Sequence, residues 1–196
     1  MNNFLYDCAK YTFWGVFGTV WRMRACGTEN VPKSGPVIIA CNHVSYFDPP
    51  VLGTTSPRRI SYMAKEELFR IPVLGPVIRA VGAYPVDREG SATAAIKRSV
   101  EVLRAGGVIG IFPEGGRNLT GAAQARGGVA LLASLGKAPV VPARLMGTGN
   151  AKRLEQFRAY FGKPLSLPAD RKASREEMAN FTDQVMRAIR SLPAQQ

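Results

Sequence analysis

Short runs of consecutive apolar residues alternate along this chain with segments whose apolar residues recur at helical spacing. The run 36–41 lies between Gly35 and Asn42 and is typical of a strand buried on both faces. Similar runs predict further strands, at 60–64, 83–86, 108–112 and 139–142. Because helical segments separate these runs, the pattern predicts one α/β domain with a mixed, largely parallel sheet flanked by helices.

Helical periodicity is clearest in residues 91–105, which Ser91 can cap at the start and Gly106 can end. The stretch 68–81 predicts a shorter helix, because two prolines interrupt it. Two more helices are predicted nearer the C-terminus, at 127–135 and 174–191. The strand at 83–86 contains Pro85, which places that proline at an edge of the sheet or at the end of the strand.

Residues 1–28 form a segment of their own, an N-terminal amphipathic helix ahead of the main domain at 29–196. Its apolar run, 11–21, is too short to span a bilayer, which needs about 20 residues. The run is rich in aromatic residues and has basic residues on both sides, as in a helix that lies in a membrane interface. It therefore predicts membrane contact by four aromatic side chains, Phe13, Trp14, Phe17 and Trp21. The alternative is a helix that packs its aromatic side chains onto the protein's own core.

Basic residues outnumber acidic ones, 26 to 14, which gives the 196-residue chain a formal net charge of +12. Such an excess favours anionic partners, namely nucleic acid, an anionic lipid surface or a phosphorylated substrate. The charge is spread along the chain, without a basic tail, a basic helix or an aromatic-plus-basic strand motif. Nucleic acid is therefore not expected as a partner.

The three cysteines, Cys8, Cys26 and Cys41, are scattered, and their spacing gives neither a disulfide framework nor a C-x-x-C motif. With a single histidine in the chain, a Cys/His zinc site is not expected, and no metal is assigned. The first residues lack a basic n-region and a small-residue cleavage site, so a secretory signal is not expected. The sequence thus predicts a peripheral membrane protein on the cytoplasmic face, in a reducing compartment.

The single histidine, His43, directly follows the predicted strand 36–41, and Asp48 comes five positions later. Ligands of open α/β sheets bind beyond the carboxyl ends of strands, where this histidine lies. An imidazole is a natural general base near neutral pH, and a nearby carboxylate can orient it. The alternative role of Asp48 is to be the N-cap of a helix that has Pro49 at its first position. Cys41 as a nucleophile is disfavoured, because a cysteine in such a run is more often part of the core.

Two other predicted strands also run into reactive groups. The strand 108–112 leads into Pro113, Glu114, Gly115, Gly116 and Arg117, in which glycines allow close backbone approach and arginine can bind a phosphate. The strand 83–86 leads into Asp87 and Arg88. The alternative in both cases is a tight turn with an exposed acid–arginine pair.

Together these stretches resemble the lysophospholipid acyltransferase family, which includes 1-acyl-glycerol-3-phosphate acyltransferases. The family's signature is His-x-x-x-x-Asp, a Gly-x-x-x-x-Asp/Asn-Arg-like block, Phe-Pro-Glu-Gly-x-Arg, and a short apolar block that ends in proline. This chain has these blocks in the same order, at 43–48, 82–88, 112–117 and 140–142, and the resemblance covers about residues 30–165. It departs from the pattern at Gly116 and Asn118, where the family often has threonine and serine.

The resemblance implies a reaction and a set of roles. His43, oriented by Asp48, would deprotonate the free hydroxyl of a lysophospholipid, which would attack a fatty acyl thioester without a covalent enzyme intermediate. The donor would be acyl-CoA or acyl carrier protein, the product phosphatidic acid for phospholipid biosynthesis, and no metal or cofactor would be needed. The alternatives are a different lysophospholipid or polar acceptor, or a lipid-binding module without activity.

The resemblance also implies which residues bind the substrates. Arg117 and Arg88 would hold the acceptor phosphate, and Glu114 with the backbone around Gly115 would position the glycerol. Lys65 and Arg126 are weaker candidates for phosphate or donor binding, because an exposed basic side chain is usually only solvated.

Overall fold

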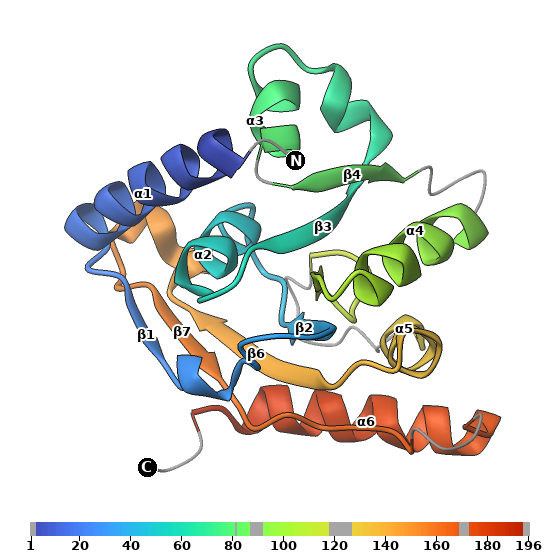
Figure 1. Cartoon of the computed structure of the whole chain (residues 1–196). Coiled ribbons are helices and arrows are strands. Elements are labelled where there is room, and N and C mark those ends of the chain that lie inside the picture. The colour runs from blue at the N-terminus through green and yellow to red at the C-terminus, as the bar shows by residue number, and fades with distance from the viewer. Residues whose placement is uncertain (1–2, 81, 87–91, 118–126, 169–172, 194–196) are drawn as a thin grey trace.

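A computed structural model of the chain describes residues 3–80, 82–86, 92–117, 127–168 and 173–193 (Figure 1). In these ranges seven strands form one sheet in the order β1-β7-β6-β2-β5-β3-β4, and all neighbours are parallel except β6 and β7. The strands are β1 Arg24–Cys26, β2 Val37–Cys41, β3 Ile60–Lys65, β4 Ala83–Val86, β5 Val108–Ile111, β6 Val140–Met146 and β7 Arg158–Phe161. The predicted α/β domain with a mixed, largely parallel sheet is confirmed.

Helices cover both faces of this sheet (Figure 1). They are α1 Asn3–Val20, α2 Asp48–Thr55, α3 Leu74–Ala80, α4 Ala92–Arg104, α5 Gly128–Gly136 and α6 Arg175–Ser191, with 3₁₀ turns η1 Thr28–Asn30, η2 Glu66–Arg70 and η3 Thr148–Arg153. The capping box between Ser174 and Glu177 explains why α6 begins at Arg175, because both side chains satisfy backbone N–H groups there.

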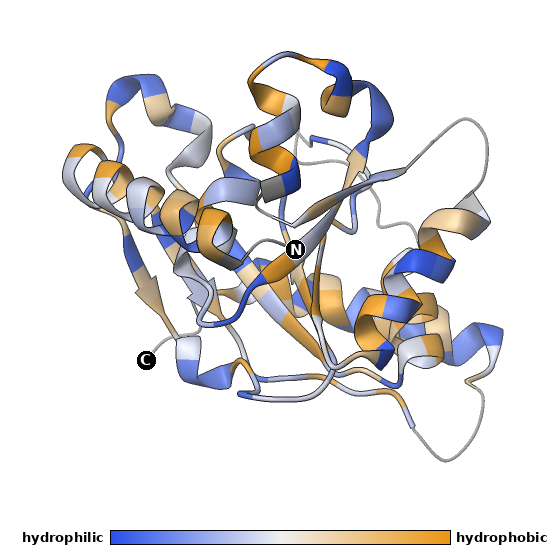
Figure 2. Ribbon diagram, turned by 45° about the horizontal axis from the view of Figure 1, so that its top comes forward, coloured by the Kyte–Doolittle hydropathy of each residue, from blue (hydrophilic) through white to orange (hydrophobic). Residues whose placement is uncertain are grey.

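The core lies in two layers, one on each face of the sheet, and β2 contributes to both. Val37, Ile39 and Cys41 face the layer under α1 and α2, whereas Ile38 and Ala40 face the layer under α4, α5 and α6. Figure 2 shows the hydrophobic colour on the central strands and on segments of the helices around them. A strand buried on both faces explains the uninterrupted apolar run that predicted it.

The N-terminal segment is part of the sheet as well as of the helical layer. The helix ends at Val20, and β1 follows within the segment 1–28, where it pairs with β7 in parallel. Neither β1 nor β7 was predicted. Each is short and begins with an arginine, so neither has the apolar run by which the other strands were found.

Three of the four aromatic side chains predicted to contact a membrane pack against the protein's own core. Phe17 is only 3% exposed, so the prediction that it contacts a membrane is wrong. Phe13 and Trp21 are half-buried and pack against the same core, where the Trp21 indole stacks on Phe157 and donates a hydrogen bond to the Ala151 carbonyl at 2.9 Å. For these three aromatics the alternative, a helix docked on its own core, is what the structure shows. Trp14 lies on the outer side and is 61% exposed.

Arg58 ties together the loops at the amino-terminal edge of the sheet. Its guanidinium donates hydrogen bonds to the carbonyls of Pro32, Gly35 and Gly106, at 3.0, 2.8 and 2.6 Å. The last two of these residues precede β2 and β5, so one side chain fixes the starts of both central strands.

Among the described residues, no helix is both long enough and apolar enough to cross a bilayer.

Candidate active site

His43 and Asp48 form a hydrogen-bonded pair at the carboxyl end of β2. The Nδ1 atom of His43 lies 2.8 Å from Oδ2 of Asp48, whose side chain is fully buried, whereas the imidazole is 17% exposed. The same carboxylate oxygen accepts hydrogen bonds from the backbone N–H groups of Val44 and Ser45, both at 2.7 Å. Because an ionised carboxylate only accepts, Nδ1 carries the hydrogen and Nε2 is left with its lone pair.

Asp48 holds His43, but it is not the N-cap that the alternative predicted: the N-cap of α2 is Phe47, and no side chain among the described residues caps this helix. Asp48 is the first residue of α2 and is followed by prolines at the first positions of the helix. A negatively charged side chain interacts favourably with the dipole at a helix N-terminus, which suits a carboxylate at the first position of α2. Its second oxygen, Oδ1, is buried and has no hydrogen-bond partner among the described residues.

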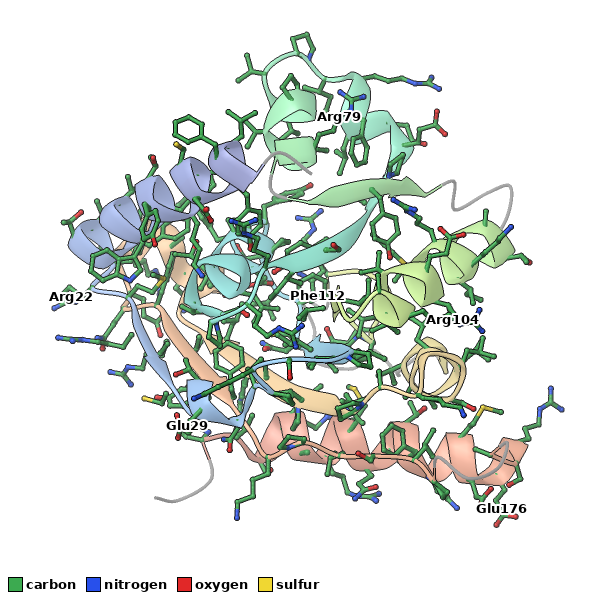
Figure 3. The ribbon with its side chains drawn as sticks, in the orientation of Figure 1. Arg22, Glu29, Arg79, Arg104, Phe112 and Glu176 are labelled. Carbon is green, nitrogen blue, oxygen red and sulfur yellow. The ribbon has the colours of Figure 1, made fainter. Side chains whose placement is uncertain are left out.

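Aromatic rings hold the imidazole from one side. The ring of His43 stacks on Phe112 with centroids 4.2 Å apart, and Phe112 in turn stacks on Tyr62 at 6.4 Å. Figure 3 shows Phe112 near the centre of the molecule. Tyr62 lies over Gly110 of β5, where a Cβ atom would collide with its ring. The strand therefore has glycine there, which makes room for the stack behind the imidazole.

The second block lies directly against the first. Glu114 accepts a hydrogen bond from the backbone N–H of His43 at 3.0 Å, which joins the loop after β5 to the loop after β2. Gly115 has a positive φ of 72° and donates its N–H to the Phe112 carbonyl at 2.9 Å, closing the turn that presents Glu114. The guanidinium of Arg117 lies 3.8 Å from the centroid of the Tyr46 ring, within the first block. A positive charge is thereby placed beside the His43 loop.

The sheet order explains why these blocks meet. β2 and β5 are neighbours and parallel, so the residues after them lie at one edge. Lys65 ends β3, the next strand along, and is exposed at this same edge. Arg88 and Arg126 lie outside the described residues, so their expected roles remain predictions.

Two contacts at the site were not predicted from the sequence. Asn42 fixes the end of β2 to β6, because its side-chain amide donates to the Leu145 carbonyl at 3.0 Å and its oxygen accepts from the Leu145 N–H at 2.7 Å. Tyr46 provides the ring under Arg117. Asn42 lies beside the His43–Asp48 block and Tyr46 lies within it, so their place in the sequence was the one available signal for a role at the site. Their partners, Leu145 and Arg117, are distant in the chain.

Cys41 is unsuited to act as a nucleophile. Its side chain is fully buried, and this burial, with the nearby Asp48 and Glu114 carboxylates adding to it, raises the thiol pKa well above its usual range. The thiolate is the reactive form of cysteine, so a thiol held neutral in the core is inert.

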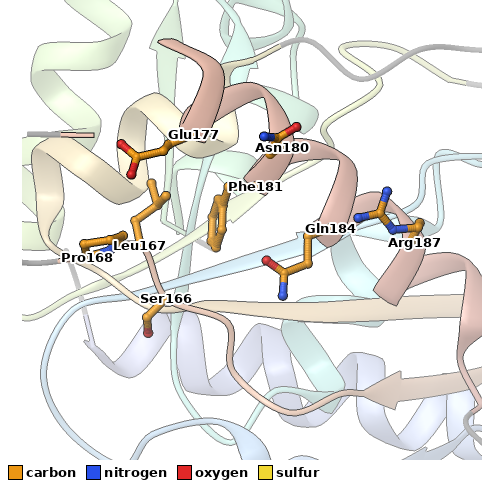
Figure 4. Close-up of a pocket in the computed structure, with 8 residues that line it drawn as sticks. All are labelled: Ser166, Leu167, Pro168, Glu177, Asn180, Phe181, Gln184 and Arg187. Atoms are coloured by element: carbon orange, nitrogen blue, oxygen red, sulfur yellow. The ribbon is translucent and has the colours of Figure 1, made fainter. Parts of the chain in front are cut away.

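A separate cavity of about 410 Å³ lies between segment 166–168 and α6 (Figure 4). Phe181 and Leu167 form its apolar wall, and Gln184 and Arg187 lie along the helix side. It contains none of the residues predicted to act in the reaction, and α6 covers the face of the sheet away from α1 and α2.

Comparison with known proteins gives concordant results. A family model described as Acyltransferase matches residues 22–146. The chain is 36% identical to the 1-acyl-sn-glycerol-3-phosphate acyltransferase of Bacillus subtilis (strain 168) over 180 residues, which cover 87% of each chain. It is 29% identical to the enzyme of the same name from Streptococcus pneumoniae, over 84% of this chain and 64% of that one.

The fold is shared with a solved structure. The crystal structure of the 1-acyl-sn-glycerophosphate acyltransferase PlsC from Thermotoga maritima superposes with a TM-score of 0.72 and 23% sequence identity. The match covers 100% of this chain and 85% of that one. The whole sheet and its flanking helices thus follow an architecture seen in that protein.

Proposed function

The chain belongs to the acyltransferase family, and we propose that it transfers a fatty acyl group from an acyl thioester to the free hydroxyl of 1-acyl-glycerol-3-phosphate, giving phosphatidic acid. The observation that carries this proposal is the His43–Asp48 pair, 2.8 Å apart, with Glu114 and Arg117 brought beside it from the next strand. The printed names of the relatives support the same acceptor.

The geometry supplies a base on the side of the imidazole away from Asp48. Nε2 of His43 accepts the proton of the acceptor hydroxyl while the hydroxyl oxygen attacks the thioester carbonyl carbon. Asp48 stabilises the imidazolium that forms. The C–O bond forms, the tetrahedral intermediate collapses, and the C–S bond breaks. The proton then passes from His43 to the departing thiolate, so the enzyme returns to its starting state with no acyl group attached.

The acceptor phosphate needs positive charge next to this base. Arg117 is exposed and held against Tyr46, so its guanidinium has a fixed place beside the His43 loop and a face open to ligand. An arginine fork matches two phosphate oxygens. We assign the phosphate to Arg117, with Arg88 and Lys65 as further contacts, and the glycerol to Glu114 and the backbone of Gly115.

The acyl donor in this proposal is acyl-CoA or acyl carrier protein, both of which are anionic and suited to a chain of net charge +12. The reaction would serve phospholipid biosynthesis. No cofactor enters any step of the proposed mechanism.

We also propose that the protein works as a peripheral protein on the cytoplasmic face of a membrane, through the outer face of α1. The two charged residues of this helix are held inward: Asp7 pairs with Arg59 at 2.6 Å, and Lys10 donates to the Ser56 carbonyl at 2.7 Å. The exposed residues between positions 4 and 20 carry no charge, and they are Phe4, Leu5, Cys8, Tyr11, Thr12, Trp14, Val16, Thr19 and Val20. A soluble helix normally shows charged side chains on this face.

The function is tested by supplying the purified protein with 1-acyl-glycerol-3-phosphate and either acyl-CoA or acylated carrier protein, then identifying the lipid products by mass. Phosphatidic acid is expected with at least one donor, and its formation should vanish in His43→Ala. If neither donor yields product, other acceptors are screened with the same donors. Phosphatidic acid formed equally well by His43→Ala would overturn the mechanism.

A further inference from the structure

The connection from β3 to β4 carries an exposed apolar apex at the turn between η2 and α3. We define the apolar apex as Ile71, Val73, Leu74 and Val77, which are 44, 79, 39 and 38% exposed. Four large apolar side chains exposed within seven residues form a local patch, unlike the isolated apolar residues that are usual on protein surfaces.

Hydrogen bonds and close packing define the backbone of the turn that carries the apolar apex. Leu74 and Gly75 donate their N–H groups to the carbonyls of Pro72 and Ile71, both at 2.8 Å, and Gly75 packs so closely on the Phe69 carbonyl that no Cβ atom would fit. Phe69 itself is 5% exposed and anchors the turn in the protein. A fixed backbone therefore presents these side chains outward.

The backbone of Val73 has a conformation that other residue types adopt more readily than valine does. Its φ is +67°, in the left-handed region, where a β-branched side chain is a rare exception. Glycine adopts a positive φ without a steric penalty, asparagine adopts it more readily than a β-branched residue does, and both are less apolar than valine. A valine that is 79% exposed serves neither the turn nor the core, so its apolar character needs an external explanation.

Basic side chains flank the apolar apex. Arg70 and Arg79 lie on either side of it, and both are exposed; Arg79 also lies over the Phe69 ring at 5.3 Å. Glu66 pairs with Arg70 at 2.8 Å, and Glu67 follows it in the first turn of η2, whereas Arg79 forms no ion pair with any described residue. Apolar side chains between arginines are complementary to a surface that has an apolar interior and anionic headgroups.

Leu74 and Val77 of the apolar apex belong to α3. This helix packs against α1, and Figure 1 shows it beside the N-terminal half of α1. The 3₁₀ turn η2, which leads into the apolar apex, begins directly after Lys65, at the sheet edge that carries His43. The connection that carries the apolar apex thus starts at the edge of the sheet where the candidate active site lies.

We propose that the apolar apex inserts into the interface of an anionic phospholipid bilayer and, together with the outer face of α1, seats the enzyme on the membrane that holds its lipid acceptor. The identity of that acceptor rests on the proposed function. The insertion itself rests on the exposure, the rigid turn and the flanking arginines.

The test is co-sedimentation of the full chain with vesicles of equal parts phosphatidylcholine and phosphatidylglycerol. Val73→Asn relieves the backbone strain, so the thermal midpoint should stay the same or rise, while vesicle partitioning should fall about tenfold, as expected when one valine no longer inserts. Val77→Asn is the second variant, with the same expected direction. The matched control is Leu135→Asn, which removes a 42% exposed leucine from α5 on the other face of the sheet and should sediment like wild type.

Acylation is followed in parallel with lysophosphatidate in the vesicles and with a short-chain, dissolved lysophosphatidate. Val73→Asn should lose activity on the first substrate and keep it on the second. Wild-type protein that acylates neither substrate would refute the proposed function, yet sedimentation would still test insertion. Unchanged sedimentation of both apex variants would overturn the inference, as would a change only in oligomeric state, which would assign the surface to a second copy of the chain.

Discussion

At the scale of single residues, the candidate site depends on how many neighbours fix one imidazole. His43 is held by Asp48 at Nδ1, by Glu114 at its backbone N–H and by the Phe112 ring against its face. The pairing of His43 with Asp48 could be predicted, because the spacing and the preceding strand both indicated it. The ring stack and the support from Glu114 could not, because they join residues about 70 positions apart.

Asp48→Asn tests the orienting role of the carboxylate. The asparagine oxygen can still accept from Val44 and Ser45, but the charge that stabilises the imidazolium is lost, so kcat should fall by about 10²- to 10⁴-fold. Hydrogen bonds to a neutral amide oxygen are weaker than those to a carboxylate oxygen, so the free energy of unfolding should fall by about 1–3 kcal/mol. Steady-state kinetics and urea unfolding measure both, and a kcat within twofold of wild type would contradict the role.

At the scale of helices and strands, apolar patterning predicted β2 to β6 and was clearest for the strands that are buried on both faces. β2, β5 and β6 were predicted because neighbours cover both of their faces. β1 and β7 form by pairing with a distant partner, which periodicity does not reveal. Phe13 and Phe17 of α1 and Trp21 just after it repeat every four residues and form one stripe, whereas Trp14 lies about 100° around the helix. The spacing of these aromatic residues predicted that they share one face of the helix. It did not show whether that face packs against the core or contacts a membrane.

Arg58→Lys tests how the starts of β2 and β5 are held. A lysine ammonium cannot reach three carbonyls in the fork geometry of a guanidinium, so the free energy of unfolding should fall by about 1–3 kcal/mol. The control is Arg98→Lys, in an exposed pair with Glu101, where the change should be under about 0.5 kcal/mol. Because Arg58 lies at the edge opposite His43, kcat should be unchanged; equal stability of the two variants would contradict this role.

At the scale of the whole molecule, the sheet brings together residues that are far apart in the sequence and buries some of their titratable side chains. This burial determines how the free energy of unfolding depends on pH in alkaline solution. Burial raises the pKa of Cys41, Tyr6 and Tyr62, and that of Tyr84 to about 12. Above a pH of about 8.5 the unfolded chain loses these protons before the folded protein does. The unfolded state then binds fewer protons, so the free energy of unfolding must fall as pH rises.

Urea unfolding at about pH 8 and about pH 10 should therefore show lower stability at the higher pH. In Tyr62→Phe the fall should be smaller, because one of the buried phenols is absent. The variant should also be more stable than wild type at pH 8, since the buried Tyr62 hydroxyl has no hydrogen-bond partner among the described residues. A steeper fall in the variant than in wild type would contradict the assignment.

The central claim is that His43 activates the acceptor hydroxyl directly, and a single-turnover measurement of thiol release tests it best. Wild-type protein in excess over acyl-CoA, or over acylated carrier protein if that is the accepted donor, should release thiol only when 1-acyl-glycerol-3-phosphate is present. His43→Ala should slow that release by about 10²- to 10⁴-fold. A burst of thiol without acceptor would reveal an acyl-enzyme, and either that burst or full activity in His43→Ala would contradict the mechanism.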